Sequence, residues 1–198
     1  MSLQESITDT GHKHDNSMST LAAIYKRRAV RSYLPQKPGR ELVMSLLAAA
    51  VQAPSAMNEE PWAFAVIQTP QLLREISDAA KALMAPELRK QLTELFKAPD
   101  YNIFYNAGTL IVIYAGPAST YAEADCWLAA ENLMLAACAV GLGTCVIGLA
   151  SAILNTPPWK HRLGIPEKHT AYVPLIVGVP AGNTPPVPRK QPQILAWQ

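Results

Sequence analysis

The chain has 198 residues, of which 49% are apolar and 16% are charged, and this is enough apolar material for the core of one domain. Its 17 basic and 15 acidic residues give a net charge of +2, which is too balanced for nucleic-acid binding by bulk electrostatics, so any anion site must be local. The three cysteines, Cys126, Cys138 and Cys145, lack CxxC spacing. They argue against a disulfide framework or a zinc site and predict buried thiols in a reducing cytoplasm.

The N-terminal region separates into a tail and a helical start. Residues 1–20 have neither the apolar core of a signal peptide nor the Arg-rich pattern of a transit peptide, and we expect a flexible tail. A single domain is expected over residues 21–198. Its first periodic segment, residues 21–31, predicts a short helix ending near Tyr33. Residues 40–52 are rich in leucine and alanine and predict a second helix.

Strand and helix patterns follow one another in the middle of the chain. Residues 62–67 are rich in aromatic and β-branched side chains and predict a strand. Residues 71–95 place apolar side chains at helical spacing, with a break near Pro86, and predict two amphipathic helices that cover the core. Residues 109–114 form a mostly β-branched run between two glycines, which is typical of a central buried strand.

Residues 122–140 predict a helix that is apolar on most faces and ends at Gly141, a residue suited to a left-handed C-cap. The apolar run continues to Ala150 and is long enough to cross a hydrocarbon core of about 30 Å. Its polar residues, Asp125, Glu131 and Asn132, argue against a membrane span. A helix buried on nearly every side in so small a protein instead predicts packing against its copy in a second subunit.

The C-terminal part predicts two more strands, over residues 143–148 and 172–179. Residues 180–198 are rich in proline and end in apolar residues, so we expect an ordered arm that lies over the partner subunit. Strands alternate with helices but without regular β-α-β spacing. The order of elements therefore predicts an α+β layered domain.

Two segments offer binding groups but no reactive pair. Arg27, Arg28 and Arg31 are spaced to converge on a phosphate if they lie on a helix, although a solvated basic helix end has the same pattern. The chain has no GxGxxG fingerprint and no phosphate-binding P-loop. The stretch "APSAMNEEPWAF" at residues 53–64 offers Ser55, Asn58 and backbone amides. Such groups suit a planar heteroaromatic ligand, and a turn that caps a helix is the simpler alternative.

Taken in order, several motifs resemble those of the FMN-dependent nitroreductase family. They are "RRAVRSY", "APSAMNEEPW", "ENLMLAACAVGLGTCVIG", "LGIP" and "VGVP", and they span the chain from about residue 21 onward. The resemblance implies an α+β three-layer sandwich with a mixed central sheet and an intertwined homodimer with two FMN sites at its interface. It also implies that NAD(P)H donates electrons through FMN to a nitroaromatic, quinone, enone or flavin by a ping-pong mechanism, without a catalytic side chain or a metal.

The resemblance further assigns the cofactor contacts. The phosphate would be bound by Arg27, Arg28 and Arg31, and Arg189 and Lys190 would reach it from the C-terminal arm. The ring and ribityl chain would be contacted by a loop of the other subunit, through Pro54, Ser55, Ala56 and Asn58. Backbone amides of Ile147, Gly148 and Leu149 would face the N5 and O4 edge of the flavin. Two positions depart from the family pattern: Ala29 replaces a common serine in the phosphate site, and Glu60 replaces the usual glutamine.

Two other functions fit the same motifs. Relatives of this architecture remove halogens, oxidise peptides or fragment flavin, and residues 71–106 are the candidate for a substrate lid of that kind. A dimer that binds flavin for storage or sensing, without catalysis, is the non-enzymatic alternative. The sequence does not choose the electron acceptor or the preference between NADH and NADPH.

Overall fold

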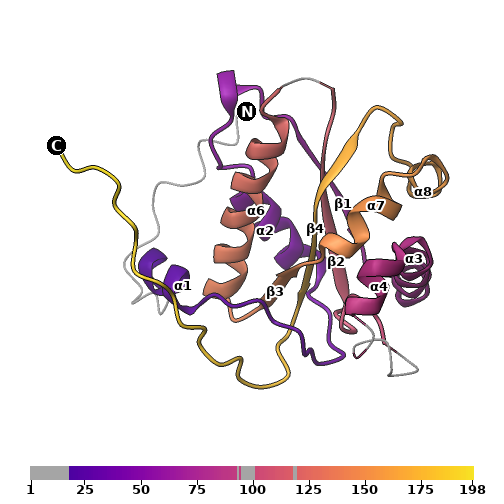
Figure 1. Cartoon of the computed structure of the whole chain (residues 1–198), viewed down its shortest axis with the longest axis horizontal. Helices are drawn as coiled ribbons and strands as arrows, with labels where there is room; N and C mark the ends of the chain where they lie inside the picture. The colour runs from indigo at the N-terminus through magenta and orange to yellow at the C-terminus, as the bar shows by residue number, and fades with distance from the viewer. Residues whose placement is uncertain (1–17, 93, 95–100, 118–119) are drawn as a thin grey trace.

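The computed structural model describes residues 18–92, 94, 101–117 and 120–198, so most of the expected tail at 1–20 lies outside the described residues. Within them, one sheet is covered by helices on both faces (Figure 1). Its strands are β1 (Trp62–Ile67), β2 (Thr109–Ala115), β3 (Gly143–Val146) and β4 (Thr170–Gly178), in the order β1-β2-β4-β3. The expected α+β class and three-layer sandwich are confirmed.

The strand pairs β1–β2, β2–β4 and β3–β4 are all antiparallel, so the expected mixed sheet is wrong. The mixed sheet was expected from the family resemblance alone, and strand composition could not test it, because parallel strands are apolar when they are buried on both faces. An antiparallel strand between two helical layers has the same composition, and every residue of β2 is buried. Among the described residues, the parallel pairing is a single bridge between Ala29 and Thr144.

Each face of the sheet has its own apolar core, because side chains alternate along a strand. Ile111 and Ile113 of β2 face α2 (Arg40–Ala50) and α6 (Ala122–Ala139). Leu110 and Val112 face the other layer. That layer contains α3 (Pro70–Leu83), α7 (Ser151–Leu154) and α8 (Pro157–Leu163). The central position predicted for residues 109–114 is confirmed.

The long helix α6 ends as its sequence predicted. Gly141 has a φ of 80°, and the Leu142 amide donates to the Ala137 carbonyl over 2.8 Å, which satisfies an open carbonyl at the helix end. We expected α6 to be buried on nearly every side. In a single chain its outer face is not, because Trp127 and Leu128 are exposed. Among the described residues, none of the helices has the length and apolar character that a membrane crossing needs.

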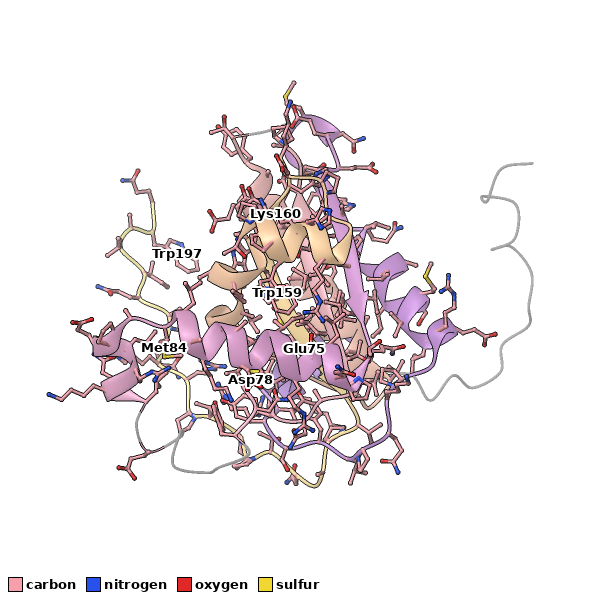
Figure 2. The ribbon with its side chains drawn as sticks, turned by 90° about the vertical axis from the view of Figure 1, so that its right-hand side faces the viewer. Glu75, Asp78, Met84, Trp159, Lys160 and Trp197 are labelled. Atoms are coloured by element: carbon pink, nitrogen blue, oxygen red, sulfur yellow. The ribbon has the colours of Figure 1, made fainter. Side chains whose placement is uncertain are left out.

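On the opposite face, α3 is followed by α4 (Pro86–Gln91), which confirms two helices broken near Pro86. Figure 2 looks onto this layer, where Glu75 and Asp78 of α3 lie below Trp159 of α8. An ion pair between Arg162 and Glu75 joins the two helices, and the Arg162 guanidinium lies 5.0 Å from the Trp159 ring centroid. This layer forms the cover that its amphipathic pattern predicted.

The first helix is shorter than expected, because α1 (Thr20–Lys26) ends before the arginines. Residues 27–31 are extended instead, and the Val30 amide donates to the Thr144 carbonyl over 2.9 Å. Val30 is buried and fills the space beside Gly143, where a Cβ atom would lie 2.7 Å from the Val30 Cγ2. This tertiary contact outweighs the weak helix preference of the segment.

Candidate functional site

The three arginines do not share a helix face, so the spacing argument for their convergence is wrong. Arg27 donates from Nε to Oε1 of Glu131 on α6 over 3.1 Å. Arg28 folds back on the end of α1, where its Nη1 donates to the carbonyls of Tyr25 and Arg27 over 2.7 and 2.8 Å. Arg31 is exposed. The three guanidiniums therefore do not converge on one partner within the chain.

A cavity of about 360 Å³ opens beside this segment. Lys26, Arg27 and Arg28 line it on one side, and Thr144 and the start of the C-terminal arm line it on the other. The Nε of Arg28 is itself buried and has no hydrogen-bond partner among the described residues. A buried donor without an acceptor is costly, so an anion oxygen in this cavity would be favourable.

Arg31 lies on the sheet side of the segment, close to three groups with raised pKa values, Cys145, Tyr33 and Tyr101. Burial raises the pKa of the Cys145 thiol, and the Arg31 charge opposes that rise. Burial and the nearby Cys145 raise the pKa of the Tyr33 phenol, again against Arg31. Tyr33 therefore stays protonated and donates to the Val30 carbonyl over 2.8 Å. The surroundings of Arg31 leave its positive charge uncompensated by a carboxylate among the described residues.

The loop at residues 54–60 has a strained backbone. Met57, Asn58 and Glu60 have φ values of 53°, 55° and 47°, in the left-handed region that favours glycine. The Oγ of Ser55 accepts a hydrogen bond from the Glu60 amide over 2.9 Å, which closes the turn. Pro54 and Asn58 are exposed and Ser55 and Ala56 are half-buried. Strain of this kind persists at sites where the surroundings impose it, and such sites are often functional.

A third part of the site follows β3. The short helix η2 (Gly148–Ala150) begins at Gly148, which is exposed, and Ile147 caps it without a side-chain hydrogen bond. The first amides of a helix have no partner within it. Those of Gly148 and Leu149 can therefore donate to a ligand. The third amide expected here, that of Ile147, instead donates to the Pro174 carbonyl over 2.8 Å, so its assignment to a ligand is wrong.

Within one chain the arginine segment and the loop at 54–60 do not meet. The loop at 54–60 contacts α6 at Asp125 in its first turn, whereas Ala29 pairs with Thr144 beyond the other end of the helix. Helix α6 has 18 residues and is about 27 Å long at 1.5 Å per residue. In Figure 1, the short helix η1 (Ala56–Asn58) lies near one end of α6, and α1 and β3 lie near the other end. The arginine segment and the loop at 54–60 are thus separate within one chain.

Arg189 and Lys190 lie on the exposed C-terminal arm, and among the described residues neither forms an ion pair with another side chain. Two residues that sequence reasoning had not assigned to the site are Glu131, which pairs with Arg27, and Asp125, which binds the Ala56 amide. Their signal in the sequence was the presence of carboxylates on an otherwise apolar helix. Such carboxylates need partners when the helix is packed.

Comparison with known proteins places this arrangement in a family. The profile of the nitroreductase family matches residues 24–179. The chain belongs to the nitroreductase family. The matched region begins within α1 and ends just after β4, so it contains the arginine segment, the loop at 54–60 and the helix end at Gly148.

Several relatives show how far the likeness extends. A protein of Archaeoglobus fulgidus, named as a candidate NADH dehydrogenase/NAD(P)H nitroreductase, is 30% identical over 81% of this chain and 84% of its own length. A crystal structure of a nitroreductase with bound FMN from Bacteroides fragilis has a TM-score of 0.81 and 27% identity, covering 92% of this chain and all of that one. Iodotyrosine deiodinase bound to FMN and 3-iodo-L-tyrosine has a TM-score of 0.70 and 25% identity, covering 89% and 97%.

Proposed function

We propose that this nitroreductase-family protein is an FMN-dependent oxidoreductase that passes electrons from NAD(P)H to an electron-poor small molecule. FMN is bound in the similar Bacteroides fragilis structure, and the Archaeoglobus fulgidus relative is named for NADH and NAD(P)H chemistry. The observation in this chain that supports the proposal most is the cationic cavity beside α1. Arg28, which lines that cavity, has a buried Nε without an acceptor among the described residues, and a phosphate oxygen could supply one.

The residues present fit FMN at both ends of the molecule. Arg27 and Arg28 would hold the phosphate, with Arg31 adding an exposed positive charge to the same segment. The amides of Gly148 and Leu149 would donate to acceptor atoms on the ring edge, where such a hydrogen bond tunes reactivity. When bound, FMN would supply the two-electron chemistry that no side chain of this site can supply.

A second copy of the chain would complete the site. Pro54, Ser55, Ala56 and Asn58 lie at the far end of α6 from the arginines, so a two-fold dimer would bring the loop of one protomer to the cavity of its partner. Exposed apolar side chains along the same layer support this assembly. They are Leu21, Ile24 and Tyr25 of α1, Met44 of α2, and Trp127 and Leu128 of α6.

This reaction asks little of the protein beyond binding and orientation. The site offers amides, guanidiniums and small side chains, so the chain itself would orient the two substrates and exclude water rather than transfer protons. Reductant and acceptor would occupy the same face in turn, which predicts ping-pong kinetics. The acceptor would be a nitroaromatic, a quinone, an enone or free flavin.

Reductive dehalogenation is a second candidate, because the similarity to iodotyrosine deiodinase covers 89% of this chain. It would use the same cofactor and the same arginine segment with a halogenated aromatic acceptor. Turnover of 3-iodo-L-tyrosine, measured by iodide release with dithionite as reductant, would separate it from nitroreduction. Absence of iodide alongside turnover of a nitroarene would exclude it.

The decisive experiment is an anaerobic absorbance spectrum of the purified protein, reconstituted with FMN, before and after addition of NADPH or NADH. Bleaching of the oxidised-flavin band would establish the reductive half of the reaction. A flavoprotein that does not bleach would favour storage or sensing, and failure to bind FMN would refute the proposal.

A further inference from the structure

Asp125 connects the loop at 54–60 to the rest of the protein. It lies in the first turn of α6 and is only 3% exposed. Its Oδ1 accepts a hydrogen bond from the Ala56 amide over 3.2 Å, across 69 residues of sequence. Of the hydrogen bonds made by residues 54–60 in the part of the chain that the structure describes, this is the one that leaves the loop.

The loop needs such an anchor because its own bonds do not fix its position. Its internal hydrogen bonds, including that from the Glu60 amide to Ser55 Oγ, only close the turn on itself. The backbone of Met57, Asn58 and Glu60 remains in a region that non-glycine residues avoid. A conformation of this kind persists only where neighbouring groups hold it.

Burying Asp125 is costly, and packing of α6 does not require it. Its second oxygen, Oδ2, is buried without a hydrogen-bond partner among the described residues. An apolar side chain would fill the same place without that cost. Its position at the helix N-terminus offsets part of the penalty, because the helix dipole favours a negative charge there. The remaining contact that distinguishes a carboxylate from an apolar residue is the bond to the Ala56 amide.

We propose that Asp125 is a positioning residue for the flavin site: it holds the Ala56 amide and thereby fixes the loop that contacts the cofactor from the partner subunit. It does not itself touch the cofactor. The inference rests on the proposed function, but its structural half concerns the loop alone. The two halves are therefore measured separately.

The first measurement is hydrogen exchange of residues 54–60 in the full-length protein without FMN. Asp125→Ala should speed exchange of the loop amides by about tenfold, the factor expected for the loss of one ordinary hydrogen bond. Asp125→Asn keeps an oxygen that can accept from Ala56 and should stay close to wild type. Glu123→Gln removes an exposed carboxylate from the same helical turn and is the matched control. Unchanged exchange in Asp125→Ala would overturn the proposal.

The second measurement is FMN affinity, by quenching of flavin fluorescence. Asp125→Ala should weaken it by about tenfold, while Asp125→Asn and Glu123→Gln retain it. Equal affinity of Asp125→Ala and wild type would overturn the positioning role. If the wild type itself does not bind FMN, the proposed function fails, and the exchange experiment still decides whether Asp125 anchors the loop.

A third variant approaches the same bond from its donor. Ser55 has φ −135° and ψ 152°, a conformation that suits a residue before proline. Ala56→Pro therefore removes the amide hydrogen without requiring a new backbone at Ser55. If the bond is the link, the double variant Asp125→Ala/Ala56→Pro should lose no more FMN affinity than Ala56→Pro alone. Additive losses would overturn the proposal. If Asp125→Ala does not fold, Ala56→Pro alone should still speed exchange of the remaining loop amides, and unchanged exchange in that variant would overturn the proposal.

Discussion

The Nε of Arg27 donates to Oε1 of Glu131 over 3.1 Å and ties the segment after α1 to the middle of α6. The pair orients one guanidinium at the edge of the cationic cavity. Both side chains are partly exposed, so the pair itself contributes about 1 kcal/mol or less to folding stability. The main effect of the pair is therefore to position the Arg27 guanidinium.

Arg27→Ala should therefore affect binding more than folding. Loss of one charged hydrogen bond to phosphate corresponds to about 10- to 100-fold weaker FMN affinity. Glu131→Gln keeps an accepting oxygen and should change the affinity by less than about threefold. Fluorescence titration measures both, with Arg40→Ala on α2 as the control. Unchanged affinity in Arg27→Ala would remove this residue from the phosphate site.

Substitutions of Arg28 and Arg31 should differ in their effects on stability and FMN binding. Arg28→Ala removes the donor to the Tyr25 carbonyl at the end of α1, so it should lower stability by about 1 kcal/mol as well as weaken FMN binding. Arg31→Glu reverses an exposed charge and should release FMN while the FMN-free protein unfolds at nearly the wild-type temperature. Thermal unfolding with and without FMN distinguishes them. Retained FMN in Arg31→Glu would contradict the phosphate assignment, and Arg31→Lys is the charge-preserving control.

Local patterns were sufficient for much of the fold. The strand at 62–67 was predicted with the bounds that β1 has, because its β-branched and aromatic residues form a short local signal. The end of α6 was also predictable, since Gly141 carries the positive φ of a C-cap. Signals of this kind depend on residues that are neighbours in sequence.

What the sequence did not predict depends on distant residues. The segment at 27–31 is extended because Val30 pairs with Thr144 and fills the space at Gly143. Neither partner is visible from the helical periodicity of residues 21–31. The hydrogen bond between Asp125 and Ala56 likewise joins two segments, and neither segment alone carries a sequence signal for the other. The antiparallel pairing of the sheet was not predictable either, because buried strands have the same apolar composition in parallel and antiparallel sheets.

Gly143 should be sensitive to the addition of a single methyl group. A Cβ there would lie 2.7 Å from Val30 Cγ2 and 2.8 Å from Val30 Cβ, and such overpacking costs about 1–3 kcal/mol. Gly39→Ala is the control, because a Cβ at that position meets nothing within 4 Å. Urea unfolding of the FMN-free proteins measures the difference. Equal stability of the two variants would show that Val30 moves freely and that the extended segment is loosely held.

Cys126 and Cys145 should be unreactive in the native protein. Burial, and to a smaller extent the charges of Asp125 and Glu123, raise the pKa of Cys126 to about 12, and burial raises that of Cys145. At pH 8 both remain thiols, and the thiolate is the nucleophile. Iodoacetamide followed by peptide mass analysis should modify neither until urea unfolds the chain, which then exposes all three cysteines. Rapid native labelling of Cys126 would contradict its burial on the packed face of α6.

Leu128 offers the sharpest test of the dimer. It is 46% exposed on α6, and Leu128→Glu would place a charge in the apolar interface that we infer for the two α6 helices. Sedimentation should then show a monomer, and FMN binding should fall with it because the loop and the arginine segment no longer meet. Leu83→Glu, at a 53% exposed position on α3, is the control on the opposite layer and should leave the dimer intact. A Leu128→Glu protein that remains dimeric with full FMN content would mean that the subunits meet elsewhere, and a monomer that still binds FMN tightly would mean that one chain suffices for the site.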